Sequence, residues 1–287
     1  MKNISTAHSS TQLMKRKITN NTFFSLLIAS ILLTQSCKLA DIRTDYSKTS
    51  TASAKGKEIL RESAKAMNAE RLLDYNTYSV TLEDQFYGIV GKVANPYNEN
   101  SPELAIDYVP GKFIGKMQLM SGKKHGSTYF NNEGKTFYKS AKGKTKEENK
   151  VAEFWVPTYQ YFLELPTQIQ RASIITYAGD TAMNGIEYDL VIASWNSLEP
   201  QKDIDQYLIW INKETKHLDY AQFTIRDVNG FAIATAMYKD YIQKDGLSFP
   251  SIIAIHGKKH ATGKIHEIRI KELAFNKVDQ STITAFK

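Results

Sequence analysis

Histidines near the carboxyl end of the chain are the residues best spaced for metal chemistry. His256, His260 and His266 lie around the turn of a predicted hairpin, where two imidazole rings could meet across strands. Lysines stand between them, and no carboxylate lies closer than Glu267. Because positive charge opposes a bound cation, a solvated polar turn is the favoured interpretation, and we predict no metal site.

Carboxylates near a second hairpin are the other group with the chemistry for catalysis. Asp203, Asp205 and Asp219 could bring two acids together for acid–base work, although acids beside strands usually only solvate turns. The chain contains no serine-hydrolase elbow, zinc-protease motif, phosphate-binding loop or dinucleotide fingerprint. We therefore predict that the protein is not an enzyme and needs no cofactor. A hydrolase built from scattered polar groups remains an alternative.

The single cysteine, Cys37, follows a segment typical of export. Residues 15–17 are basic, and residues 23–33 form an apolar run that is too short to cross a bilayer as a helix. The run ends in Leu33-Thr34-Gln35-Ser36-Cys37, which resembles a bacterial lipobox. That resemblance implies cleavage before Cys37 and attachment of acyl chains to its sulfur, which would give a stable membrane anchor.

Two alternatives concern this segment. An ordinary secretory peptide that happens to contain a cysteine would leave a free exported thiol. A start at Met14 would give a shorter leader of the same kind. The predicted organisation is a lipoprotein signal peptide over residues 1–36, a flexible tether over residues 37–55, and one folded domain over residues 56–287.

The charge of the chain argues against a nucleic-acid partner. The formal net charge is +7, but four basic residues and no acid precede Cys37, so the rest of the chain carries only +3. Nucleic-acid binding needs clustered positive charge as well as a basic excess. We therefore predict no contact with nucleic acid.

The aromatic residues are concentrated in one central segment, residues 151–170, between the two halves of the predicted strands. Five rings lie within nine residues of it, and Pro157 and Pro166 bracket a short helix or an irregular stretch. Burial of one such ring contributes roughly 1.5–3 kcal/mol, so a role in the core would explain them. A ligand-binding wall is the alternative.

The hairpin over residues 205–227 is the element around which the other strands are ordered. Tyr207, Ile209 and Ile211 share one face of its first strand, and Leu208 and Trp210 share the other. A strand with one face in water would alternate apolar and polar residues, so we expect cover on both faces of this one.

Further strands and one helix complete the predicted architecture. Residues 56–73 carry apolar residues at helical spacing, and residues 78–82 and 85–93 read as strands. Asn184-Gly185 and Asp245-Gly246 are tight-turn signals between later strands. The expected fold class is mainly β (α+β): an N-terminal helix and a large twisted antiparallel sheet, with one central aromatic helical insertion.

Three stretches together resemble the LolA/LolB-type lipoprotein-carrier superfamily over about residues 56–280. They are YLIWINKETKHLDYAQFTI in the hairpin, YKDYIQKDGLSFPSIIAIH after it, and YFLELP in the aromatic segment. In that superfamily an open antiparallel barrel wraps around helices and encloses an apolar cavity. The resemblance implies that the large curved sheet of this chain forms an incomplete barrel around the N-terminal helix and the central aromatic helical insertion, and that the protein is an envelope lipoprotein.

By this resemblance the protein binds a hydrophobic or lipid-like ligand between sheet and helices. It would be held by Cys37 on a membrane, expected to be the outer membrane on its periplasmic side. The alternative is a structural or interaction lipoprotein with a filled core and no ligand. Oligomeric state and ligand identity stay open. The candidate lining residues are Trp155, Tyr159, Phe162, Trp195, Trp210 and Phe223.

Overall fold

The computed structural model describes residues 39–43, 50–257 and 263–285. The chain divides into two units, Met1–Leu39 and Ala40–Lys287, and the second unit carries the helices and strands described below. Cys37, the predicted signal peptide of residues 1–36 and His260 lie outside the described residues.

A single antiparallel sheet of thirteen strands forms the second unit, in the order β6-β5-β4-β3-β2-β1-β13-β12-β11-β10-β9-β8-β7. The central pair joins the first strand to the last, and the two edge strands do not pair with each other, so the sheet is an open barrel. The strands are Tyr78–Phe86 (β1), Glu103–Val109 (β2), Ile114–Leu119 (β3), Thr128–Asn132 (β4), Lys135–Lys139 (β5), Thr145–Glu147 (β6), Ile174–Met183 (β7), Ile186–Ser194 (β8), Gln206–Asn212 (β9), Leu218–Thr224 (β10), Ile233–Lys244 (β11), Leu247–His256 (β12) and Lys264–Phe275 (β13).

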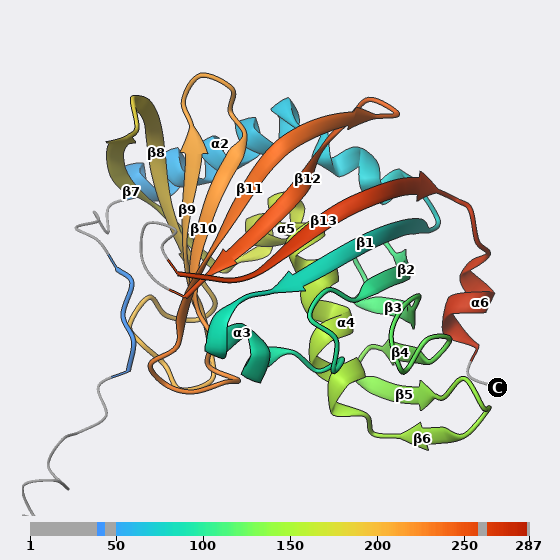
Figure 1. Ribbon diagram of the computed structural model, residues 1–287. Helices are drawn as coiled ribbons and strands as arrows, with labels where there is room; N and C mark the ends of the chain where they lie inside the picture. The colour runs from blue at the N-terminus through green and yellow to red at the C-terminus, as the bar shows by residue number, and fades with distance from the viewer. Residues whose placement is uncertain (1–38, 44–49, 258–262, 286–287) are drawn as a thin grey trace, which may run out of the picture. The chain divides into compact units, whose positions relative to one another are not determined.

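Three of the helices, α2, α4 and α5, pack against the main core on one side of the sheet. Figure 1 shows one long helix, α2, crossing behind strands β7 to β11, and α4 and α5 lying in the bend between the two halves of the sheet. The helices are Ser50–Ala66 (α2), Gly88–Ala94 (α3), Lys150–Leu163 (α4), Leu165–Gln168 (α5) and Gln280–Thr284 (α6), with 3-10 turns at Ala69–Asp74 (η1) and Ile169–Arg171 (η2).

Within residues 39–43, 50–257 and 263–285, no helix is both long enough and apolar enough to cross a bilayer.

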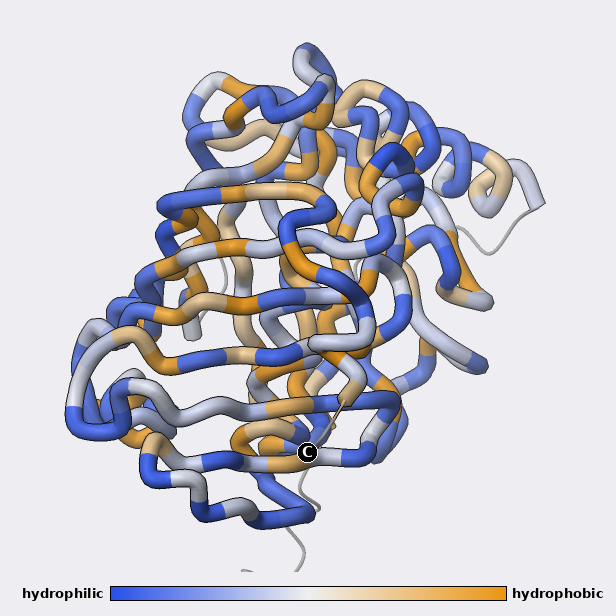
Figure 2. The backbone as a smooth tube through the Cα atoms, turned by 90° about the vertical axis from the view of Figure 1, so that its right-hand side faces the viewer, coloured by the Kyte–Doolittle hydropathy of each residue, from blue (hydrophilic) through white to orange (hydrophobic). Residues whose placement is uncertain are grey.

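The turn chemistry of the sequence explains the regular hairpins. Asn184 and Gly185 have φ values of 53° and 80°, and Asp245 and Gly246 have 51° and 78°. Two successive residues with positive φ match the right-handed twist of the strands that they join. Figure 2 shows apolar and polar residues alternating along the strands, as a sheet with differently covered faces requires.

Both faces of β9 are buried, as its sequence predicts. Ile209 and Ile211 belong to the main core between sheet and helices, while Leu208 lies in a second apolar cluster on the opposite face. The cover on that second face includes Ile42, whose exposed fraction is 2%. A segment expected to be a free tether therefore supplies the missing cover.

The folded part of the chain begins earlier than its composition indicates. Helix α2 starts at Ser50, six residues before the predicted start, and Ala40 and Ile42 are buried against strands and turns of the sheet. Gly56 lies within the helix, where an added Cβ would come 2.7 Å from the backbone of Thr176. Small residues such as those of 50–56 let a helix approach a strand closely, and this favours packing over a flexible tether.

The predicted strand over residues 85–93 is wrong beyond Phe86. Gly88 has a φ of 61°, which turns the chain out of the sheet, and the short helix α3 follows. The prediction of a mainly β fold with an open antiparallel barrel, an N-terminal helix and a central helical insertion is confirmed.

Candidate functional site

Helix α4 and the short helix α5 place most of the predicted rings against the sheet. The side chain of Asn149 caps the start of α4 by accepting from the backbone N–H groups of Val151 and Ala152. The helix continues through Pro157, where the sequence suggested a boundary, and breaks at Glu164. The helical cover of the sheet is thus interrupted at one residue, just before Pro166.

Trp155 and Tyr159 lie together on α4 and face the half of the sheet that contains β1. Their rings are 5.5 Å apart, and Trp155 also meets Phe86 at 5.9 Å and His266 at 5.6 Å. Only 8% of Trp155 is exposed. These rings therefore pack in the space between helix and sheet.

A buried polar network runs through this aromatic cluster. The Tyr159 hydroxyl donates to Asp84 Oδ2 over 2.6 Å, and His266 Nδ1 lies 2.8 Å from Asp84 Oδ1. Burial, together with the negative charge of Asp84, raises the pKa of Tyr159 well above its ordinary value. Its hydroxyl therefore stays protonated as a donor, and the network ties α4 to β1 and β13.

Phe162, Phe223 and Trp195 belong to a second aromatic cluster further along α4. The ring centroids of Phe162 and Phe223 are 5.5 Å apart. Tyr207 connects Phe223 with Trp195, because its ring centroid lies 6.0 Å from that of Phe223 and 5.8 Å from that of Trp195. The structure thus brings three of the six predicted residues together here, through a tyrosine that the prediction omitted.

Trp210 is separated from the other five predicted residues by the sheet itself. It packs on the apolar cluster of the opposite face, where Tyr188 and Tyr220 are each 5.6 Å from its ring. Alternation along β9 places Trp210 opposite to Ile209 and Ile211, so the sequence already contained this signal. One cavity lined by all six rings is therefore not formed.

Glu164, at the break between α4 and α5, is a buried residue that the sequence prediction missed. Its two carboxylate oxygens accept four hydrogen bonds of 2.8–3.0 Å, and 1% of the residue is exposed. Burial raises its pKa, and the hydrogen bonds oppose that rise. The donors are the Tyr78 hydroxyl, the Gly111 backbone N–H and the side-chain amides of Gln160 and Gln168.

The four bonds give Glu164 a mechanical role. They connect the helix break to β1 through Tyr78 and to the β2–β3 turn through Gly111. The signal available in the sequence was an acid inside an otherwise apolar segment, YFLELP, where a charge has to find buried partners.

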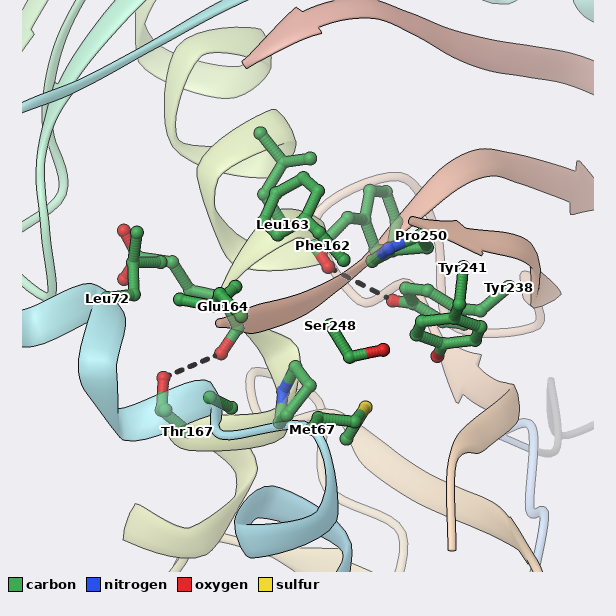
Figure 3. Close-up of a pocket in the computed structure, with 14 residues that line it drawn as sticks. Met67, Leu72, Phe162, Leu163, Glu164, Thr167, Tyr238, Tyr241, Ser248 and Pro250 are labelled. Atoms are coloured by element: carbon green, nitrogen blue, oxygen red, sulfur yellow. Dashed lines mark hydrogen bonds between the residues drawn. The ribbon is translucent and has the colours of Figure 1, made fainter. Parts of the chain in front are cut away.

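A small apolar pocket lies beside the helix break (Figure 3). Its volume is about 20 Å³, which is room for about one water molecule. In the close-up, the Tyr238 hydroxyl points to the Phe162 carbonyl oxygen, to which it donates over 3.4 Å. Of the six predicted residues, Phe162 lines this pocket. The other lining residues are Met67, Ala69, Leu72, Leu163, Glu164, Pro166, Thr167, Tyr238, Tyr241, Leu247, Ser248, Phe249 and Pro250.

The histidine and aspartate candidates do not assemble into a reactive site among the described residues. His266 pairs in register with Ile255, so it shares that face of the sheet, and the adjacent His256 points to the other face. Asp205 accepts hydrogen bonds from Thr224 and the Arg226 backbone, whereas Asp219 lies beside Asn212 at the opposite end of the hairpin. No group of three metal-ligating side chains occurs in the part of the chain that the structure describes.

Proteins similar to this chain are found by structure. No protein-family model and no curated protein sequence matches the chain. A domain assigned as an outer membrane lipoprotein-sorting protein from Vibrio parahaemolyticus aligns with a TM-score of 0.56 and 15% identity, over 80% of this chain and 97% of its own. A LolA superfamily protein from Nitrosomonas europaea aligns with a TM-score of 0.55 and 11% identity, over 80% and 97%.

The chain has a LolA-like fold. A DUF1329 family protein from Desulfovibrio piger shares it, with a TM-score of 0.56 and 9% identity over 81% of this chain and 97% of its own. Identities this low establish the architecture, and none of the three proteins is named for an enzymatic activity. In this chain, two aromatic clusters occupy the space between α4 and the LolA-like sheet.

Proposed function

We propose that this protein is an envelope lipoprotein, anchored through Cys37, that binds a lipid or another elongated apolar molecule between its sheet and helices α4 and α5. The observation that carries the proposal is the apolar pocket at the helix break. It lies where the cover of a LolA-like sheet is interrupted, so it marks the place where a ligand could enter with the least displacement of packed side chains.

The described conformation is the closed one under this proposal. Ligand sites usually measure about 300–1,000 Å³, far above the 20 Å³ of the pocket. An acyl chain would therefore have to displace the α4–α5 junction from β11 and β12. Phe162 lines the pocket and its ring contacts that of Phe223, so the ligand would meet Phe162 first and Phe223 next. Trp155 and Tyr159 would become accessible only if α4 moved further.

A filled interior favours a second candidate function, that of an interaction lipoprotein without a ligand. Trp155 and Tyr159 are packed on several rings, and the polar network around Asp84 is closed by hydrogen bonds. Such an interior would be complete without any bound molecule. Neither candidate requires catalysis or a cofactor.

Purification of the full-length protein from membranes of cells fed an alkyne fatty acid tests both parts of the proposal. The alkyne label should appear on the wild-type protein and be absent from a Cys37→Ala variant. Native mass spectrometry should detect a non-covalent adduct that is lost on unfolding, and the purified protein should bind a fluorescent fatty acid saturably.

A pocket-filling variant and a matched control make the ligand result specific. Ala69→Leu adds three carbon atoms to the pocket lining and should weaken binding of the fluorescent fatty acid about tenfold or more. Ile186→Leu changes an exposed apolar residue on the β7–β8 hairpin and should leave binding unchanged. Labelled protein with neither adduct nor saturable binding would favour the interaction lipoprotein instead.

A further inference from the structure

Five apolar side chains stand out from the rest of the described surface. Among the described large apolar residues they alone are more than half exposed, with exposed fractions between 56% and 83%. Two lie on the turn between β10 and β11, and three on α3. We call this set the apolar rim: Ile89, Val90, Val93, Val228 and Phe231.

The rim occupies one end of the sheet. The register pairs Thr224 with Ile233, Thr235 with His256 and Phe86 with His266, which places the β10–β11 turn and α3 beyond the same strand ends. Figure 1 draws both at the lower end of the sheet. Three strand spacings separate them, or about 14 Å, so the rim forms a broad surface rather than an isolated spot.

Helix α3 is fixed with its apolar side outward. The Tyr87 N–H donates to the Ile265 carbonyl oxygen over 2.7 Å, and a Cβ on Gly91 would come 2.4 Å from that same oxygen. Gly91 is the buried residue of the helix, while Ile89 and Val93 are each 83% exposed. A surface helix normally buries its apolar residues and exposes its polar ones, whereas α3 exposes its three large apolar residues together with Lys92.

The amino-terminal end of the folded unit is held at this same end of the sheet. The Ala40 N–H donates to the Gly230 carbonyl oxygen over 2.7 Å, and Arg226 Nη2 donates to the Ala40 carbonyl oxygen over 2.6 Å. Gly230 lies between Val228 and Phe231 on the turn. Cys37 precedes Ala40 by three residues, and three residues of extended chain reach at most about 11 Å.

We propose that the apolar rim contacts the interfacial region of the bilayer that holds the acyl chains of Cys37. This inference rests on the proposed anchor and adds an orientation, with the β10–β11 turn and α3 facing the lipid. An anchor within about 11 Å of Ala40 keeps the rim near the bilayer surface. Exposed Ile, Val and Phe side chains are favourable at that depth and unfavourable in water.

Single-cysteine labelling tests the proposal on the full lipidated chain. Cys37 is the only cysteine, and its sulfur is blocked once it is acylated, so an introduced cysteine becomes the one reactive thiol. Val93→Cys and Phe231→Cys would carry an environment-sensitive dye on the rim. Ile186→Cys and Ile242→Cys are matched controls, because these exposed apolar residues lie near turns at the opposite end of the strands.

The expected result in phosphatidylcholine vesicles is a blue-shifted dye emission at Val93 and Phe231 that nitroxide-labelled lipids largely quench. Dyes at Ile186 and Ile242 should report water and resist quenching. Rim dyes that report water in acyl-labelled protein would overturn the orientation and leave the anchor standing. A blue shift without quenching by the lipid would mean that another protein or a second copy covers the rim, which also overturns the proposal. Absence of the acyl label would remove the anchor and the orientation together.

Discussion

The interior beneath α4 and the apolar rim use the same kinds of side chain in opposite ways. Beneath α4, Trp155 and Tyr159 are almost completely buried, and the polar groups among them are hydrogen-bonded. At the rim, Ile89, Val93 and Phe231 are mostly exposed. The comparison shows that this chain has enough apolar residues for a closed core and leaves a concentrated group of them outside it.

The two regions should therefore respond differently to substitution. Truncation in the interior removes packing and exposes cavities, so its effect should appear in the free energy of unfolding. Truncation at the rim removes nothing that the folded unit packs against, so its effect should appear in contact with a membrane.

Trp155→Ala should produce the largest effect on stability. Removal of a buried indole that meets Phe86, Tyr159 and His266 should lower the free energy of unfolding by about 3–5 kcal/mol. Val93→Ala, the matched change at the rim, should alter it by about 0.5 kcal/mol or less. Urea denaturation followed by circular dichroism measures both. Equal effects of the two substitutions would remove the distinction between interior and rim.

Glu164→Ala should produce the next largest effect and also change ligand uptake. The substitution leaves three buried donors and the partly buried Gly111 N–H without their acceptor, at a cost of about 3 kcal/mol in the free energy of unfolding. Because the carboxylate holds the helix break against the sheet, its loss should also speed the uptake of a fluorescent fatty acid. Stopped-flow fluorescence measures that rate.

An exposed carboxylate serves as the control for Glu164. Glu58 pairs with Arg61 on the surface of α2, and Glu58→Ala should leave both the free energy of unfolding and the uptake rate nearly unchanged. Lower stability of Glu164→Ala without faster uptake would show that the helix break is structural and is not the route of entry.

The sequence predicted the repeating hairpins and the burial of both faces of β9 because these depend on local turn residues and on alternation. It did not predict what covers the second face of β9. Ile42 packs there from a segment whose sequence has no periodicity. It is far from β9 in the sequence, so the contact exists only in the folded chain. Trp210 was grouped with the other rings by size, although its alternation placed it on the other face.

The rim and the helix break were harder to predict for a different reason. Residues 88–94 are apolar enough for a strand, and one positive φ at Gly88 turns them into a helix outside the sheet. In the sequence Glu164 looked like an ordinary acid. Its four donors, two of them remote and two one helical turn away, are brought together only in the folded protein. Local patterns do not encode such convergence.

The smallest expected effect is a change in the pH dependence of stability, and it concerns His256 at the end of β12. His266, near the start of β13, is the histidine to compare it with. His266 has Asp84 as a partner in the interior, whereas both buried ring nitrogens of His256 lack a hydrogen-bond partner among the described residues. Burial, with help from Lys264 and Lys239, lowers the pKa of His256 below its usual value. The unfolded chain then binds a proton at a higher pH than the folded protein does. Stability contributed by the neutral ring is present above the unfolded pKa and is lost as the pH falls toward the folded pKa.

His256→Gln removes this titration and keeps a polar side chain of similar length. Between about pH 7.5 and about pH 5, the wild-type protein should lose more stability than the variant, by about 1 kcal/mol or less. Urea denaturation at several pH values measures the difference, and every group other than residue 256 is common to both proteins. Parallel stability profiles would show that His256 is protonated equally in the folded and unfolded chains, and its missing partners would then have no energetic consequence.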